Sequence, residues 1–102
     1  MGLGDLQQMT MLAVARLGGE AYGASVREEL ERVAGRNVAV PTVYVTLVRL
    51  EEQGLVASNE APAAGDRGGR ARRVFELTAD GWTALGHSRA AMDRLWNGVV
   101  QQ

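Results

Sequence analysis

The stretch PTVYVTLVRLEEQGLV, residues 41–56, begins with a helical apolar pattern and changes abruptly to a strand pattern. Its apolar stripe, at spacings of three and four, contains Val43, Leu47 and Leu50. Such spacing predicts one buried face along a helix, and Pro41 suits the first turn because a proline there loses no hydrogen bond. Gly54 ends the helix. We therefore expect helix over residues 41–53 and a strand over residues 55–60.

The opposite side of this predicted helix carries hydroxyls, an aromatic ring and an arginine. The outward residues are Thr42, Tyr44, Val45, Thr46 and Arg49. Hydroxyl and guanidinium groups hydrogen-bond phosphates and base edges, and methyl groups or rings contact the thymine methyl. The pattern predicts a face that binds double-stranded DNA, the alternative being an ordinary polar helix face. Tyr44 and Val45 favour the first, because both are costly to leave in water with nothing bound.

Two predicted helices precede this one, over residues 5–17 and from residue 23 or 25 to residue 34. A short connector, residues 36–40, joins the second helix to the third, as a helix-turn-helix requires. The first helix is apolar nearly all round: one stripe contains Leu6, Met9, Leu12, Ala13 and Leu17, and the opposite side contains Met11 and Val14. We expect the core to cover one side and a partner subunit to cover the other.

A Gly-rich loop over residues 61–69 separates two predicted strands, residues 55–60 and 70–77, which would form a wing. The net charge of −1 argues mildly against a nucleic-acid partner, but residues 61–75 contain four arginines and one acid. Arginines at this loop can reach phosphates or the minor groove. The expected DNA-contacting arginines of the wing are Arg67, Arg70 and Arg72. Arg73 lies two residues from Phe75 and so shares its face of the predicted strand. We expect Arg73 to point inward, where it pairs with an acid or covers the core.

Thr78 is a suitable N-cap for a last helix, which we expect to carry an apolar stripe as far as Val99. Nothing else in the chain is left to cover that stripe, so it predicts a homodimer through the terminal helix. The expected dimer-interface residues are Leu6, Met9, Leu85, Met92, Leu95, Trp96 and Val99. The predicted fold is mainly α with a small β-wing, a winged helix-turn-helix of order α-α-α-β-β-α. Residues 1–77 would bind DNA and residues 78–102 would dimerise, as one compact unit.

The composition argues against an enzyme. The chain has one histidine, His87, no cysteine, and no motif that joins a nucleophile to a base and an orienting acid. We therefore expect no cofactor and no metal site. No apolar run is long enough to span a bilayer, and residues 1–5 lack the features of a signal peptide. The expected location is the cytoplasm.

Several motifs resemble those of the PadR family of bacterial transcriptional regulators. They are Leu3-Gly4-Asp5-Leu6, Ala21-Tyr22-Gly23, residues 42–56 and residues 72–81. The resemblance covers nearly the whole chain, and the most specific part is the tyrosine-leucine-arginine-leucine-glutamate spacing followed by Gly-Leu-Val. Pro41 stands where the family often has glycine, and Val45 where many members have proline.

The resemblance implies a dimeric winged-helix repressor that binds an operator with inverted half-sites. Thr42 and Tyr44 would contact DNA, and the arginines of residues 67–72 would lie along its backbone. The single terminal helix is similar to that of the short subgroup, some of whose members bind flat aromatic compounds between the subunits. Trp96 would then be the ligand-binding residue, or simply an anchor of the interface. A winged helix that binds a partner protein through Tyr44 and Val45 is a further alternative.

Overall fold

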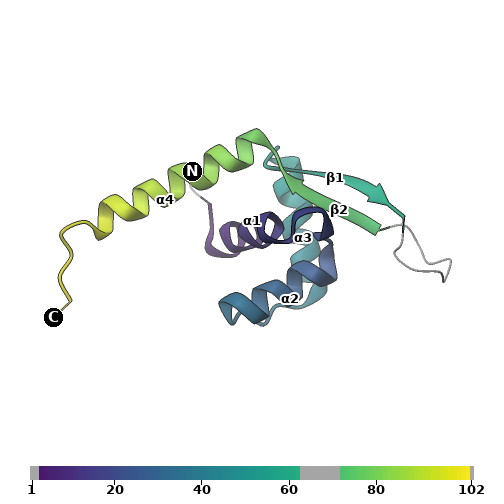
Figure 1. Cartoon of the computed structure of the whole chain (residues 1–102), viewed down its shortest axis with the longest axis horizontal. Coiled ribbons are helices and arrows are strands. Elements are labelled where there is room, and N and C mark those ends of the chain that lie inside the picture. Colours follow the sequence, from purple (N-terminus) through teal and green to yellow (C-terminus); the bar gives the residue numbers. More distant parts are fainter. Residues whose placement is uncertain (1–2, 63–71, 102) are drawn as a thin grey trace.

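The structure, a computed structural model, describes residues 3–62 and 72–101. Its elements, in chain order, are α1 (Asp5–Leu17), the 3-10 turn η1 (Gly18–Glu20), α2 (Gly23–Ala34), α3 (Val40–Glu52), β1 (Val56–Ala61), β2 (Arg72–Leu77) and α4 (Ala79–Trp96) (Figure 1). The predicted element order and the winged-helix class are confirmed. Helix α4 ends at Trp96, so the expectation that its apolar stripe continues to Val99 within the helix is wrong.

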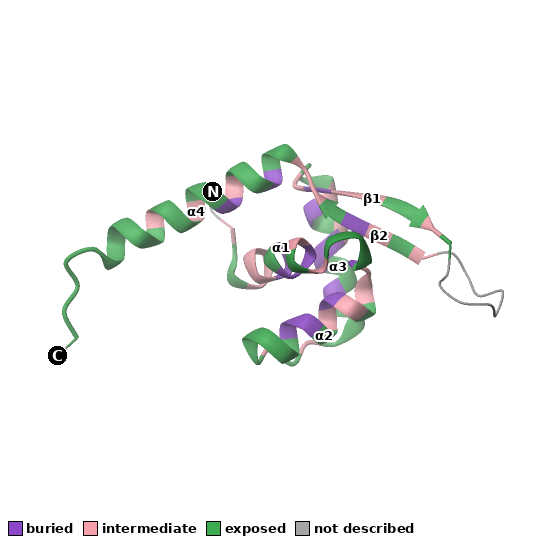
Figure 2. Ribbon diagram, in the orientation of Figure 1, coloured by how far each residue is buried: buried purple, intermediate pink, exposed green. Residues whose placement is uncertain are grey.

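The core lies between α1, α2, α3 and the inner face of the wing (Figure 2). Its largest fully buried apolar side chains are Phe75, Met11, Leu47, Leu50, Val14, Val26, Val43 and Val56. The predicted stripe of α3 is thus confirmed. On α1 the inner side is the one with Met11 and Val14, whereas Leu12 is 46% exposed. Burying each such side chain contributes about 1.5–3 kcal/mol, so these contacts fix how the three helices pack.

The wing is an antiparallel pair of strands whose register runs from Val56 opposite Leu77 to Ala61 opposite Arg72. The backbone N–H of Phe75 donates to the carbonyl of Ala21, with an N···O distance of 2.8 Å. This bond attaches β2 to Ala21, two residues before the start of α2. The Phe75 ring is fully buried, so one residue joins the wing to both the helices and the core.

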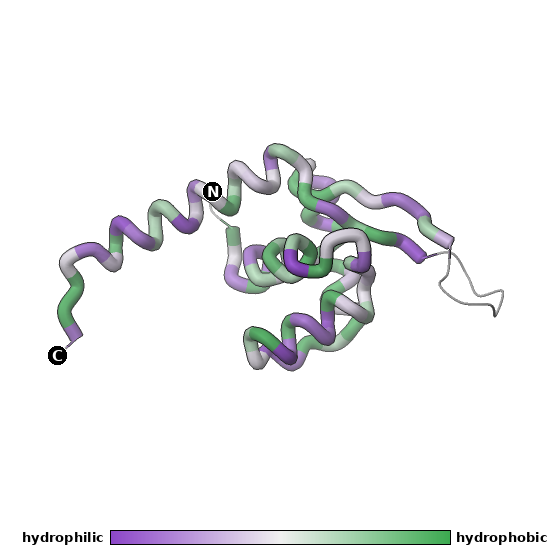
Figure 3. Tube along the Cα trace, in the orientation of Figure 1, coloured by the Kyte–Doolittle hydropathy of each residue, from purple (hydrophilic) through white to green (hydrophobic). Residues whose placement is uncertain are grey.

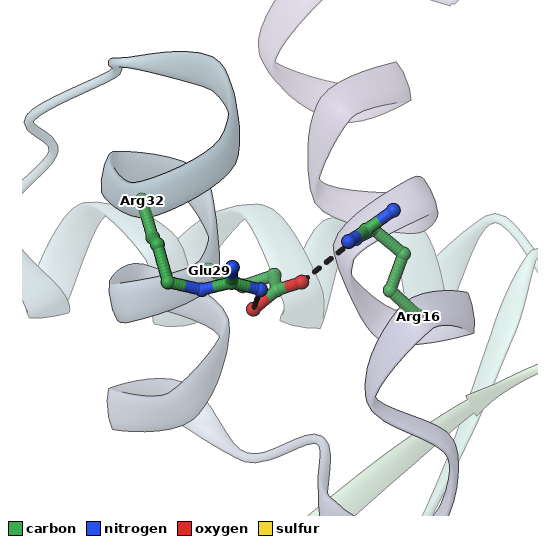
Figure 4. A network of polar contacts seen from close by, with 3 residues as sticks. All are labelled: Arg16, Glu29 and Arg32. Atoms are coloured by element: carbon green, nitrogen blue, oxygen red, sulfur yellow. Dashed lines mark hydrogen bonds and ion pairs between the residues drawn. The ribbon is translucent and has the colours of Figure 1, made fainter.

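An ion network joins α1 to α2 (Figure 4). The carboxylate of Glu29 accepts from Arg16 Nε at 2.7 Å and from an Arg32 terminal nitrogen at 2.8 Å. The Arg16 hydrogen bond, followed by the Arg32 hydrogen bond, lowers the pKa of Glu29 below its ordinary value. Both arginines are largely exposed to solvent, so the network orients the two helices more than it stabilises them.

Helix α4 leaves the body through a tight junction. The Thr78 hydroxyl accepts from the Gly81 N–H at 3.0 Å and donates to the Gly54 carbonyl at 2.7 Å, which confirms the predicted N-cap. Gly81 is buried against the backbone of Leu55, and a Cβ at that position would overlap the Leu55 carbonyl oxygen. Only glycine permits this approach, so the junction fixes where α4 starts.

Beyond this junction α4 extends away from the other helices (Figure 1). The Cα radius of gyration is 15.2 Å and the longest dimension is 56 Å, whereas a compact chain of 100 residues has a radius of about 13 Å. Apolar positions recur along α4 and into the tail after it (Figure 3), and most of them are exposed. The described part of the chain therefore leaves one face of this helix uncovered.

Thr10 is the one position where the described core holds a polar atom without a partner. Its side chain is fully buried, and its hydroxyl forms no hydrogen bond within the described residues. Thr10→Val removes the hydroxyl and keeps the shape, so the free energy of unfolding should rise by about 1 kcal/mol. Urea denaturation followed by circular dichroism measures this change. Thr10→Ser, which keeps the hydroxyl and opens a cavity, should destabilise; a less stable Thr10→Val variant would contradict the prediction.

Candidate nucleic-acid interface

Helix α3 presents an exposed face opposite its buried stripe. Tyr44 is 44% exposed and Val45 is 48% exposed, and Thr42 and Arg49 are also exposed. The expectation that Thr46 shares this face is wrong, because Thr46 follows Val43 by three residues and so lies on the inner stripe. It is buried, and its hydroxyl donates to the Thr42 carbonyl at 2.8 Å.

The ring of Tyr44 is held in place by the wing. It packs edge-on against the ring of Phe75, with centroids 6.4 Å apart and planes at 79°. Such T-shaped pairs are attractive beyond their buried area. The covered part of the Tyr44 side chain therefore packs where α3 meets β2, and its exposed surface remains free to contact a ligand.

Ionisable groups of both signs lie at the carboxyl end of α3. Arg49 forms no ion pair with any residue in the ranges 3–62 and 72–101. The neighbouring Glu51 accepts a hydrogen bond of 2.6 Å from the Ser58 hydroxyl and lies 3.9 Å from an Arg73 nitrogen. Arg73 thus lies near an acid, as expected, but its side chain is 46% exposed, so the expectation that it points inward is wrong. The contact partly compensates a carboxylate that would otherwise repel phosphate.

The first residue of β2 brings a further guanidinium to the same region. Arg72 lies over the ring of Tyr22, with its Cζ atom 4.3 Å from the ring centroid, and is half-buried rather than fully outward. Gly23, which follows Tyr22 and begins α2, lies close to the first residue of α3: a Cβ built on Gly23 would be 3.9 Å from Val40 Cγ1. The starts of α2, α3 and β2 therefore meet along one edge. Arg67 and Arg70, also expected to contact DNA, lie outside the described residues.

A second feature is a groove of about 480 Å³ between α1 and α4, lined by residues that include Gln8, Leu12, Trp82, Leu85, Met92 and Trp96. Of the residues expected in a dimer interface, Met92, Leu95, Trp96 and Val99 are exposed, and Leu6 and Met9 are half-buried against the core. Leu85 is 7% exposed and belongs to the core of its own chain, so little of its side chain is left for a partner to cover.

Sequence reasoning missed two exposed residues of this groove. Trp82 is 58% exposed and Leu12 is 46% exposed. Trp82 was visible as an apolar position of the terminal helix, whereas Leu12 could not be separated from Met11 and Val14 by spacing alone. The described residues contain no group of three His, Cys, Asp or Glu that could hold a metal ion. Within those residues, no helix is both long and apolar enough to cross a membrane.

A recognition helix with an exposed face, held against a two-stranded wing that carries arginine, defines a winged helix-turn-helix protein of the DNA-binding class. Residues 11–87 match the transcriptional regulator PadR-like family. The chain belongs to this family, whose members are DNA-binding regulators of transcription rather than enzymes.

Individual relatives agree with this assignment. The chain is 41% identical over 81 residues to the transcriptional regulator Rv3488 of Mycobacterium tuberculosis, covering 79% of this chain and 71% of the relative. It is similar to the crystal structure of a PadR-like transcription factor from Bacteroides fragilis, with a TM-score of 0.71, 27% identity and coverage of 88% and 82% of the two chains. A PadR family regulator from Eggerthella lenta gives a TM-score of 0.68 at 29% identity, with coverage of 89% and 77%.

Proposed function

We propose that the protein binds an operator of two inverted half-sites as a homodimer and represses transcription from it. The observation that carries this proposal is the exposed face of α3, where Thr42, Tyr44, Val45 and Arg49 stand beside the wing. This face has the size and chemistry to enter a major groove. Membership of the PadR-like family favours DNA over a partner protein as its ligand, and the resemblance to that family favours repression over activation.

The dimer is proposed from the apolar side chains of α4. Met92, Leu95 and Trp96 are 51%, 72% and 67% exposed in the single chain. Large apolar side chains that follow one another along a helix are covered in most soluble proteins by a partner. A second copy would cover these residues through a two-fold axis, and a two-fold dimer presents two recognition helices to two inverted half-sites.

Binding to the DNA upstream of the protein's own gene tests the interface residue by residue. Tyr44→Ala should reduce the preference for this fragment over unrelated DNA by about 10-fold, because a base contact is worth 1–3 kcal/mol. Arg49→Gln should weaken binding to both fragments alike and lower the slope of log K against log salt by about 0.9. Fluorescence anisotropy at several salt concentrations gives both quantities.

Arg94→Gln is the matched control, since it removes the same charge from an exposed position of α4 and should leave both quantities unchanged. If the unmodified protein shows no salt-sensitive binding to any such fragment, DNA is not its ligand. A reporter gene behind the same fragment decides the direction of regulation: co-expression should lower its output, and a rise would replace repression by activation.

The groove between α1 and α4 favours a second role, the sensing of a flat aromatic effector. Trp82 and Trp96 both line the groove, and the chain has only these 2 tryptophans. All tryptophan emission therefore reports on this groove. A planar aromatic effector should quench the tryptophan emission saturably and lower the affinity for DNA. The Trp82→Phe and Trp96→Phe variants each leave one tryptophan in the groove. If the compound quenched both variants no differently from a free tryptophan derivative, specific binding would be contradicted.

A further inference from the structure

We propose that Tyr22 is a positioning residue for DNA binding, whose ring holds the guanidinium of Arg72 ready to contact a phosphate. The inference rests on the proposed DNA-binding function and adds to it a residue outside both the recognition helix and the wing. Its starting observation is the stacking of Arg72 on Tyr22, with 4.3 Å between Cζ and the ring centroid. This distance lies well inside the range of about 6 Å in which a cation is attracted to an aromatic face.

Stacking uses the face of the guanidinium and leaves its edges free. All five N–H groups of an arginine lie in the guanidinium plane, so a ring below the plane competes with none of them. Arg72 forms no ion pair with any residue that the structure describes. The stacking therefore holds its charge in one place, and none of the described residues neutralises that charge, which suits bidentate binding of a phosphate.

Tyr22 can hold another side chain because its own backbone is fixed on both sides. Its N–H donates to the Ser25 hydroxyl at 2.9 Å, and its carbonyl accepts from the Val26 N–H at 2.8 Å. The carbonyl of the preceding residue, Ala21, accepts from the Phe75 N–H of β2 at 2.8 Å. The ring thus sits where α2 and β2 are tied together.

The location agrees with a role at the DNA surface. The start of α2 lies beside the start of α3, since a Cβ on Gly23 would be 3.9 Å from Val40. Thr42, at the start of the recognition helix, follows two residues later. A guanidinium stacked on Tyr22 is therefore on the edge of the molecule that a DNA backbone would pass when α3 enters the major groove.

Ordering a long side chain before binding removes part of the entropy cost of association. When a long, flexible side chain is immobilised on binding, the conformational entropy it loses weakens the affinity by about 2- to 10-fold. Tyr22→Leu should weaken DNA binding by this factor, and Tyr22→Phe, which keeps the ring, should bind like the unmodified protein. Arg72→Gln should weaken binding further and lower the salt slope by about 0.9.

The decisive measurement is a double-mutant cycle of DNA affinities with Tyr22→Leu and Arg72→Gln. In the Arg72→Gln background, Tyr22→Leu should have no further effect, because the side chain that it positions is gone. Arg73→Gln is the matched control: it removes the same charge from the next residue, which contacts Glu51 instead. In that background Tyr22→Leu should keep its full effect.

Thermal unfolding of each variant shows whether Tyr22→Leu remains folded. If it does not, fluorinated phenylalanines at position 22 replace it, because they keep the ring's shape and weaken its attraction for a cation. Affinity for DNA should then fall stepwise with fluorination. Equal effects of Tyr22→Leu in both arginine backgrounds, or no fall with fluorination, would overturn this inference while leaving DNA binding intact. An unmodified protein that binds no DNA would overturn both proposals.

Discussion

Replacing Leu95 and Trp96 together with aspartate is expected to convert the protein into a monomer and to weaken operator binding by at least about 100-fold. These side chains are 72% and 67% exposed on α4 of the single chain, and in the proposed dimer each would lie against the other copy. Two carboxylates there would have to be desolvated for the helices to pair. A monomer then loses the benefit of binding two half-sites at once, which is worth 10²- to 10⁴-fold. Light scattering measures the mass, and anisotropy measures the affinity.

The same helix offers a control with equal charge. Thr83 and Ala90 are exposed and, from helical spacing, lie on the opposite side of α4 from Met92, Leu95 and Trp96. Thr83→Asp with Ala90→Asp should leave a dimer of unchanged operator affinity. A Leu95→Asp, Trp96→Asp variant that keeps the mass of the unmodified dimer would remove α4 as the dimerisation element.

Phe75→Ala is expected to lower the free energy of unfolding by about 3–5 kcal/mol, a large part of the 5–15 kcal/mol typical of a domain. The ring is fully buried, contacts the core formed by three helices and packs against Tyr44. The corresponding fall in Tm is on the order of 20 °C for a chain of this size. Urea and thermal denaturation give the two values.

Phe75→Leu separates stability from recognition, because it keeps most of the apolar volume and removes the ring partner of Tyr44. Its loss of stability should be smaller, about 1 kcal/mol, while the preference for operator over unrelated DNA should fall. Leu77→Ala, at a half-buried position of the same strand, should cost less than Phe75→Ala and leave the preference unchanged. If Phe75→Leu retained the full preference, the edge-on contact would have no role in recognition.

Most of the fold could be predicted from sequence because each element has its own local signal. The helical stripe of α3, the glycines after the helices and the capping Thr78 act within a few residues, and the structure confirms what they indicate. Apolar spacing failed on α1, where nearly every side is apolar and only the packing of α2 and α3 decides that Met11 faces inward and Leu12 outward.

The site was less predictable, because its geometry depends on contacts between distant residues. A hydroxyl on the recognition helix predicts an outward position for Thr46, but this hydroxyl donates to the Thr42 carbonyl within the helix. The pairs Tyr44–Phe75 and Tyr22–Arg72 join residues far apart in the sequence, and no local pattern indicates either of them. Gly81 carries no signal in sequence that distinguishes it from an ordinary helix glycine, although its close approach to Leu55 sets the position of α4.

The rigid start of α4 has a consequence for the DNA that this protein can use. A helix of 18 residues is about 27 Å long, comparable to the 34 Å that separates successive major grooves on one side of a duplex. In the proposed dimer, the length of α4 would then set the distance between the two recognition helices. The close packing of Gly81 on Leu55 would fix the angle at which α4 leaves each DNA-binding unit. The spacing between half-sites would then be set by the rigid dimer rather than by a flexible linker. A few base pairs inserted between the half-sites would rotate the second one away from its recognition helix.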